Sequence, residues 1–227
     1  MKPLRVAFMG SGAGSNLRVM LEHARAGRLA ITPVLVLSDK PQAGVLEQAR
    51  RYGVREWSKT PLARRREDFE AEMLEAVSKA GAEAVILAGY MRILGPDFIR
   101  AFPERILNIH PALLPSFPGI SGVRDALTHQ TRLSGCTVHF VDEQPDHGPI
   151  VIQGAVPLGA DDTAEDLTAR IRALEHRLYP QAVQWLARGR LRLEGRKVVL
   201  LPREGPLPGA GADPPGLWLV SPGLEDF

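Results

Sequence analysis

The sequence predicts an α/β fold: a doubly wound, mostly parallel sheet, with antiparallel strands in the C-terminal part. Short apolar runs alternate with helical patterns over the first half of the chain, which is the order that builds βαβ units. The run Thr32–Ser38 is apolar almost throughout, as expected for a strand covered by helices on both faces. Beyond residue 130, two strand-like runs follow each other with only a short connection, which is typical of an antiparallel pair.

Composition limits the function classes. A chain of 227 residues can build a sizeable core, and we expect one domain over residues 1–201 followed by a Pro- and Gly-rich tail over 202–227. The net charge of +2 is too small to predict binding to nucleic acid or to an anionic membrane. Apolar runs stay below the roughly 18 residues of a membrane span, and the N-terminus does not resemble a secretory signal. The single cysteine, Cys136, fits a reducing compartment, so we expect a cytoplasmic protein with small-molecule partners; a homodimer is left open.

The first strand, Leu4–Met9, leads into a glycine-rich turn at Gly10–Asn16 and then into a helix that ends near Gly27. Glycines let main-chain N–H groups approach an anion, and a helix N-terminus adds donors and a favourable dipole, so this order predicts a phosphate site. The dinucleotide fingerprint fails because its last glycine is replaced by Ser15 or Leu17, and the P-loop lysine is missing. A small phosphate ester therefore fits better than a dinucleotide or ATP. The alternative is a tight turn without a ligand.

The next elements follow in order: a strand at Thr32–Ser38, a helix at Gly44–Tyr52, a short strand at Val54–Trp57, a helix opened by Arg64, Arg65 and Arg66 and reaching Val77, and a strand at Ala84–Ala88. We expect at least two of the three arginines to lie on a solvated face. The turn Gly89–Leu94 follows the last of these strands.

The stretch Asn108–Gly119 combines an amide, an imidazole and three prolines within a few residues. Asn108 and His110 lie two residues apart at the end of a buried strand, so on extended backbone they point to the same side. The prolines that follow stiffen the loop. An amide donor beside a titratable ring suits the stabilisation of an oxyanion. The alternative is a structural turn with a satisfied histidine.

Three loops should meet at one edge of the sheet. Gly12–Asn16, Gly89–Leu94 and Asn108–His110 all lie where predicted parallel strands end. Ligands bind at the carboxyl ends of the strands in open α/β sheets. The three loops together predict a site there more strongly than any one of them alone.

The C-terminal half contains strands at Gly135–Val141 and Ile150–Gln153, joined by a short acidic connection that carries Asp146 toward the same edge. The alternative is that Asp146 is simply a solvent-exposed carboxylate. We expect His139 and His147 to be structural or exposed rather than catalytic. Cys136, within the first of these strands, is expected to be a buried small side chain.

A capping box at Thr163–Asp166 opens a helix, in which Pro180 predicts a break or kink. Glu175 lies off the apolar face of this helix and reaches either a ligand or solvent. A hairpin is expected over residues 191–201. From Pro202 the composition is that of a linker, and we assign the tail no catalytic role.

Taken together, Gly14-Ser15-Asn16, Met91-Arg92-Ile93-Leu94, Asn108-Ile109-His110-Pro111 with Leu113-Leu114-Pro115, and Asp146 resemble the folate-dependent formyltransferases over roughly residues 4 to 200. The resemblance implies a Rossmann-like parallel sheet continued by antiparallel strands. It also implies transfer of a formyl group from 10-formyltetrahydrofolate to the amine of glycinamide ribonucleotide in purine synthesis, without a metal.

The resemblance also implies site residues, matched motif by motif. The catalytic residues would be Asn108, His110 and Asp146. The ribonucleotide would contact Gly14, Ser15, Asn16 and Glu175, and the folate would contact Arg66, Met91, Arg92, Ile93, Leu94, Asn108, Asp142 and Glu143. In this scheme Asn108 and His110 stabilise the oxyanion, while Asp146 raises the pKa of His110 and assists proton transfer. One departure is clear: where members commonly carry a His-x-His pair, this chain has Ile120-Ser121-Gly122-Val123.

Three alternatives remain at this level. Two are other enzymes of the same scaffold, a formyltetrahydrofolate hydrolase and a methionyl-tRNA formyltransferase; we expect neither, because their additional N-terminal or C-terminal domains have no counterpart in this sequence. The third is a non-catalytic nucleotide-binding module that uses only Gly12–Asn16. That reading leaves Asn108, His110 and Asp146 without a role.

Overall fold

A computed structural model describes residues 2–61, 65–203 and 219–227. The chain divides into two compact units, Met1–Asn108 and Ile109–Phe227, and the boundary falls inside the strand β5 (Ile106–His110). Arg64 and the linker-like residues 206–216, both singled out in the sequence, lie outside the described residues. Domain organisation over 1–201 stays a prediction.

The first unit is built on parallel strands. In sheet order they are β5, β4 (Ala84–Leu87), β1 (Leu4–Met9), β2 (Ile31–Ser38) and β3 (Glu56–Ser58). Strand β1 has β2 on one side and β4 on the other, so the winding direction reverses between β1 and β4. This is the topological switch point, where open α/β sheets place their ligands. The predicted parallel, doubly wound sheet is confirmed.

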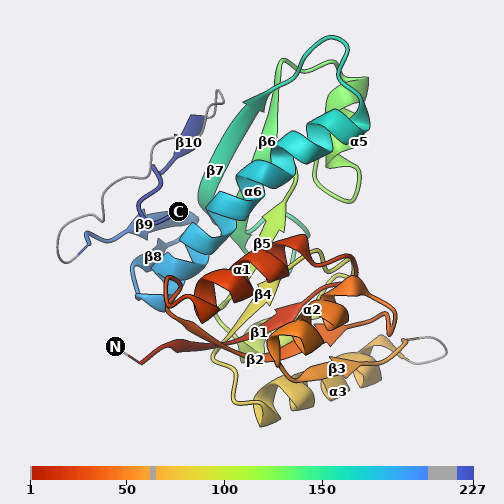
Figure 1. Ribbon diagram of the computed structural model, residues 1–227, viewed down its shortest axis with the longest axis vertical. Helices are drawn as coiled ribbons and strands as arrows, with labels where there is room; N and C mark the ends of the chain where they lie inside the picture. Colours follow the sequence, from red (N-terminus) through yellow and green to blue (C-terminus); the bar gives the residue numbers. More distant parts are fainter. Residues whose placement is uncertain (1, 62–64, 204–218) are drawn as a thin grey trace. The chain divides into compact units, whose positions relative to one another are not determined.

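Helices cover this sheet: α1 (Ser15–Arg25), α2 (Gly44–Tyr52), α3 (Arg66–Lys79) and α4 (Pro96–Ala101). Helices α1 and α2 contact each other, and so do α3 and α4; Figure 1 shows α1 and α2 side by side in front of the strands. The middle strands are buried on both faces, with Phe8 and Ile86 at 0% exposure. The near-continuous apolar runs in the sequence therefore have the expected cause. The short helix α4 was not predicted, although Pro96 stands at its first position, where proline is favoured.

The second unit contains antiparallel strands. Strands β6 (Leu133–Phe140) and β7 (Ile150–Pro157) form the predicted hairpin, and β10 (Leu219–Ser221) adds to the other edge of β7. A separate hairpin is formed by β8 (Leu191–Glu194) and β9 (Lys197–Leu200). The helix α5 (Gly122–Thr128), absent from the sequence-based prediction, precedes β6, and α6 (Ala164–Ala187) packs across β6 and β7 (Figure 1). Within the described part of the chain, no helix has the length and apolar character needed to cross a membrane.

The long helix α6 corrects one expectation. Its capping box forms as predicted, with the Thr163 side chain and the Asp166 carboxylate exchanging hydrogen bonds with each other's main-chain N–H. Pro180, however, does not end the helix, which runs on to Ala187. Residues after Pro180 are deeply buried, and Trp185 has 0% exposure. Their packing outweighs the one main-chain hydrogen bond that the proline removes.

The C-terminal segment is fixed on α6. The Gln181 side-chain oxygen accepts hydrogen bonds from the main-chain N–H of Glu225 and of Asp226, both at 2.7 Å. Trp185 Nε1 donates to Glu225 Oε2 at 3.1 Å, and Arg190 pairs with the same carboxylate. The Arg190 hydrogen bond is the main reason that the pKa of Glu225 lies below its usual value. This segment is therefore part of the folded unit and gives the second half of α6 its polar partners.

Candidate active site

The glycine-rich loop after β1 is packed tightly against the start of α2. Gly14 adopts φ +80°, and a Cβ there would lie 2.9 Å from Val45 Cγ1. A Cβ on Gly44 would approach Ala13 Cα to 2.9 Å, and Val45 N donates to Gly12 O at 3.0 Å. Side chains are therefore excluded from this contact, and the loop presents its main chain and the N-terminus of α1 at the carboxyl end of β1. This is the geometry expected for an anion site.

Two of the residues predicted for that site open the helix. Ser15 is the first residue of α1 and Asn16 the second, with Gly14 in the N-cap position. The dipole of α1 places partial positive charge at this end, because the first main-chain N–H groups of a helix point outward along its axis. The predicted residues Gly14, Ser15 and Asn16 thus form the N-terminus of α1, at the end of the turn that follows β1.

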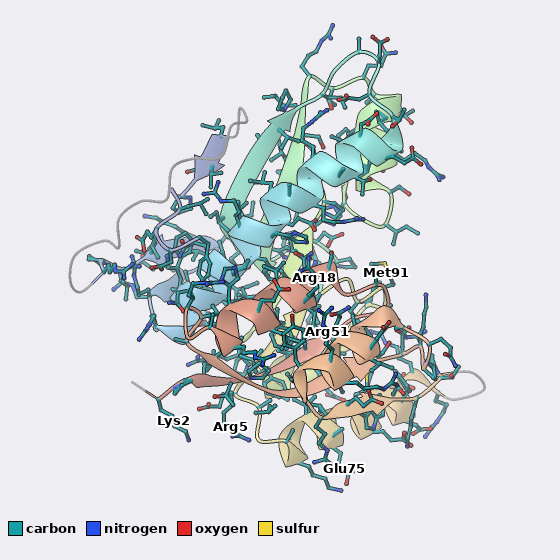
Figure 2. The ribbon with its side chains drawn as sticks, in the orientation of Figure 1. Lys2, Arg5, Arg18, Arg51, Glu75 and Met91 are labelled. Atoms are coloured by element: carbon teal, nitrogen blue, oxygen red, sulfur yellow. The ribbon has the colours of Figure 1, made fainter. Side chains whose placement is uncertain are left out.

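The turn after β4 presents apolar side chains to solvent. Gly89 adopts φ +76°, and Met91 and Ile93 are 59% and 58% exposed (Figure 2 labels Met91). Leu94, in contrast, is only 4% exposed, so its side chain belongs to the core rather than to a ligand surface. The Arg92 guanidinium lies over the Phe69 ring, 5.9 Å from its centroid.

Arg66 reaches the same turn from the first residue of α3. Its Nη2 donates to Ile93 O at 2.9 Å, and its Nε donates to Glu70 Oε1 at 2.8 Å. The Glu70 carboxylate also accepts from Gly95 N, at 2.9 Å from Oε2. The structure therefore brings together Arg66 and the segment Met91–Leu94, which the sequence alone could connect only through the resemblance.

In the second unit, His110 and Asp146 meet. His110 Nδ1 lies 3.5 Å from Asp146 Oδ2, and His110 Nε2 contacts Phe117 O at 2.8 Å. His110 is only 4% exposed. Asp146 Oδ2 also accepts a hydrogen bond from Gly119 N at 2.7 Å. The carboxylate therefore links the β6–β7 connection to the loop that follows His110.

His139, which we expected to be structural or exposed, lies at the same carboxylate. Its Nε2 is 3.8 Å from Asp146 Oδ1, and its Nδ1 contacts Phe140 O at 2.8 Å. Burial is the main cause of the lowered pKa of His139, and the neighbouring Asp146 opposes that shift. The sequence did hold a signal: Thr137 and His139 are polar residues two apart on a mostly apolar strand, which puts both on one face.

The connection that carries Asp146 is held by side-chain contacts. Asp146 itself has φ +53°. Asp142 accepts from His147 Nδ1 at 2.9 Å and from Gln144 N at 3.0 Å. Arg196, from the turn of the β8–β9 hairpin, donates to His147 O at 2.8 Å. Asp142 therefore braces the connection rather than pointing freely to solvent.

Thr137, on β6, holds the loop after His110 by hydrogen bonds. It has 0% exposure, donates to Ala112 O at 2.7 Å and accepts from Leu114 N at 3.0 Å. Gln153 Nε2 adds a contact to the same hydroxyl at 3.0 Å and donates to Leu114 O at 2.8 Å. This buried hydroxyl thus bonds to two residues of the loop and to Gln153, and the sequence alone did not indicate this role.

The remaining predicted residues have the following places. Asn108 is half-buried on β5, opposite Leu87 of β4 and two residues before His110. Glu143 is exposed, and Glu175 is half-buried on α6. Burial raises the pKa of the Cys136 thiol well above its usual value, and the Glu175 carboxylate adds to that shift. Among residues 2–61, 65–203 and 219–227, no three His, Cys, Asp or Glu side chains group as metal ligands do.

The segment that departs from the resemblance also lies beside His110. Ile120 is 89% exposed. Gly122 begins α5 beside the histidine, and a Cβ on Gly122 would lie 3.0 Å from Pro111 O and 3.5 Å from His110 Nε2. The glycine therefore allows α5 to start directly against the loop and the imidazole ring.

Comparisons with known proteins identify the family of the chain. Residues 4–183 match the family model described as formyl transferase. Phosphoribosylglycinamide formyltransferase of Escherichia coli (strain K12) is 36% identical over 211 residues, covering 92% of this chain and 100% of that protein. The crystal structure of glycinamide ribonucleotide transformylase 1 from Symbiobacterium toebii superposes with a TM-score of 0.87 at 46% identity, covering 88% of this chain and 95% of that one. The crystal structure of formyltetrahydrofolate deformylase from Burkholderia mallei gives a TM-score of 0.80 at 29% identity, covering 88% of this chain and 70% of that one. The chain belongs to the formyl transferase family.

Proposed function

We propose that the chain transfers the formyl group of 10-formyltetrahydrofolate to the amine of 5′-phosphoribosylglycinamide, a step of de novo purine biosynthesis. The family match over residues 4–183 supports formyl transfer, and the match to the whole Escherichia coli enzyme supports this acceptor. The observation that carries the proposal is the 3.5 Å approach of His110 to Asp146, at the end of the strand that also carries Asn108.

In this proposal the acceptor amine attacks the formyl carbon and a tetrahedral intermediate forms, with negative charge on the former carbonyl oxygen. The bond from that carbon to the folate nitrogen then breaks, as the nitrogen takes up the proton that the amine has lost. Asn108 offers a side-chain N–H donor for the oxyanion. Removing a donor of this kind costs roughly 3–4 kcal/mol of transition-state stabilisation in other enzymes.

His110 supplies the second donor and the general acid. Both of its ring nitrogens face acceptors, Phe117 O at Nε2 and Asp146 Oδ2 at Nδ1, so a doubly protonated ring has a partner for each N–H. To donate to the oxyanion, the ring must exchange one of these acceptors for the substrate oxygen. The 3.5 Å contact with Asp146 is longer than a hydrogen bond and is the easier one to exchange.

Asp146 would then move the proton from the attacking amine to the folate nitrogen, directly or through water. The ribonucleotide phosphate is assigned to the loop at Gly14–Asn16, with Glu175 as a further contact. The folate is assigned to Arg66, Met91–Leu94 and the connection that includes Asp142 and Glu143. Leu94 contributes through its main chain only, since its side chain is buried.

The test is formyl transfer from 10-formyltetrahydrofolate, measured once with the ribonucleotide and once with water as the sole acceptor. Turnover should require the ribonucleotide, and His110→Ala should abolish it. His23→Ala is the matched control, because His23 is a half-buried histidine near the C-terminal end of α1, where Arg28 donates a hydrogen bond to its ring. Near-normal kcat in Asn108→Ala, His110→Ala or Asp146→Asn would contradict the assigned roles.

A second candidate function is hydrolysis of formyltetrahydrofolate. The similarity to the Burkholderia mallei protein favours it, because that protein has the same fold and is named a formyltetrahydrofolate deformylase. The two functions separate in the same assay. A hydrolase releases formate at the same rate with or without the ribonucleotide, whereas the proposed transferase releases almost none until the ribonucleotide is added.

A further inference from the structure

Ser11 occupies the topological switch point of the first unit. It follows β1 by two residues, and β1 lies between β2 and β4. Ser11 is 7% exposed, and its hydroxyl donates to Asp39 Oδ1, at the end of β2, across 2.6 Å. The Ser11 Oγ also accepts from Met91 N, in the turn after β4, at 3.1 Å. One buried hydroxyl therefore joins the ends of all three strands.

The direction of these hydrogen bonds is fixed. A carboxylate only accepts and a main-chain N–H only donates, so the Ser11 proton points to Asp39 and a lone pair faces Met91. The main chain adds a third connection, because Ser11 N donates to Gly89 O at 2.9 Å. Asp39 is itself 6% exposed. A buried, charge-assisted chain of this kind is stronger than a surface contact and has a single favourable arrangement.

Such anchors hold the exposed middle of the turn Gly89–Leu94. Tyr90 and Leu94 are buried, but Met91 and Ile93 are 59% and 58% exposed, so these two side chains contribute little packing. At one end Arg66 and Glu70 of α3 hold Ile93 O and Gly95 N. At the other end the side-chain contact with Met91 N comes from Ser11. The same Ser11 begins the loop that runs through Gly12 to Gly14.

We propose that Ser11 is a positioning residue that couples the two substrate sites of the first unit. This inference rests on the proposed function, which assigns the phosphate to the loop Gly14–Asn16 and the folate to Met91–Leu94. Because Ser11 is bonded to both segments, a ligand that restricts the motion of the loop also restricts the turn, through Ser11 and Met91 N. The second ligand then meets a turn that is already ordered, so each substrate strengthens binding of the other.

The coupling is measured by binding, without turnover. The dissociation constant of the ribonucleotide is determined by titration calorimetry on the full chain, alone and with saturating tetrahydrofolate, the product that lacks the formyl group. We expect tetrahydrofolate to tighten ribonucleotide binding by roughly fivefold or more in the wild type, the lower end of typical couplings. Because linkage is reciprocal, the reverse titration must give the same factor.

Ser11→Ala should bring that factor close to one and raise both KM values, because the turn loses its link to the loop. Asp39→Asn keeps an acceptor oxygen for the hydroxyl and should retain the coupling, whereas Asp39→Ala should lose it. Ser38→Ala is the matched control: Ser38 is also buried at the end of β2, but its hydroxyl accepts from Lys40 N and contacts neither substrate segment.

The outcomes are distinct. A wild-type factor near one, or an unchanged factor in Ser11→Ala, would overturn the coupling. Equal weakening of both ligands with the factor preserved would show a merely structural role and would also overturn it. If Ser11→Ala does not fold, Asp39→Ala and Asp39→Asn decide by the same measurement. Failure of the proposed function has another signature, namely binding of both ligands without formyl transfer.

Discussion

Replacing Thr137 by valine tests how the loop after His110 is held in place. The substitution keeps the shape of the side chain and removes the hydroxyl that bonds Ala112 O at 2.7 Å and Leu114 N at 3.0 Å. Each of these two bonds contributes about 1 kcal/mol. Gln153 Nε2 also loses its 3.0 Å contact with the hydroxyl, although it keeps Leu114 O as an acceptor, and this loss adds up to about 1 kcal/mol. We therefore expect the free energy of unfolding to fall by about 2–3 kcal/mol. For a chain of this size, that lowers Tm by about 5–10 °C.

Urea unfolding followed by circular dichroism gives the stability, and steady-state formyl transfer gives kcat. Thr137→Ser keeps the hydroxyl and loses only one buried methyl group, about 1 kcal/mol, so it separates hydrogen bonding from packing. Thr131→Val is a second control, because that hydroxyl makes a single long contact of 3.5 Å at a half-buried position. Thr137→Val within 0.5 kcal/mol of the wild type would refute the reasoning, and so would equal losses in the valine and serine variants.

Three further predictions concern charge and anchoring. The hydrogen bond from Arg190 lowers the pKa of Glu225. The ionised carboxylate therefore stabilises the folded state fully above the unfolded pKa near 4.5, and this stabilisation is lost as pH falls through the lower folded pKa. Glu225→Gln should lower Tm at pH 7 and make the fall of Tm in acid less steep. Burial lowers the pKa of His139, so the folded state resists its protonation and stability should begin to fall as pH drops below about 6.5. His139→Gln should remove that component from a pH series of urea midpoints, and an unchanged slope would contradict it. Arg196→Ala should raise KM for the formyl folate severalfold by loosening the β6–β7 connection, while Arg192→Ala, on the same hairpin but paired only within it, should leave KM unchanged.

Much of the fold was predictable because its signals are local. Periodicity identified β1, α1, β2 and α2 to within a few residues, since apolar runs broken by glycine and proline mark each end. Helices α4 and α5 were missed because helices of six and seven residues show too little periodicity to detect. Of the break or kink predicted at Pro180, the break does not occur, because burial across the unit, which the sequence does not display, outweighs a local preference.

For the candidate site, motif and spacing identified His110 and Asp146, and the structure brings them to 3.5 Å. The buried partners were harder to find. Thr137 and His139 lie inside an apolar strand, and nothing local shows that their shared face meets a loop from another part of the chain. Ser11 and Asp39 are 28 residues apart and pair only because β1 and β2 end side by side. Such pairs depend on sheet order, which a single sequence specifies only indirectly.

The isolated thiol of Cys136 has a practical consequence. It is the only cysteine in the sequence, has 0% exposure and lies in the middle of β6, and burial raises its pKa well above the usual value. A thiol reagent can therefore react only with molecules in which this strand has opened. Labelling rates with a chromogenic disulfide, followed with and without substrates, would report the opening equilibrium of the strand that carries Thr137 and His139. Cys136 thus reports on local opening of the strand beside the candidate site, without an engineered cysteine.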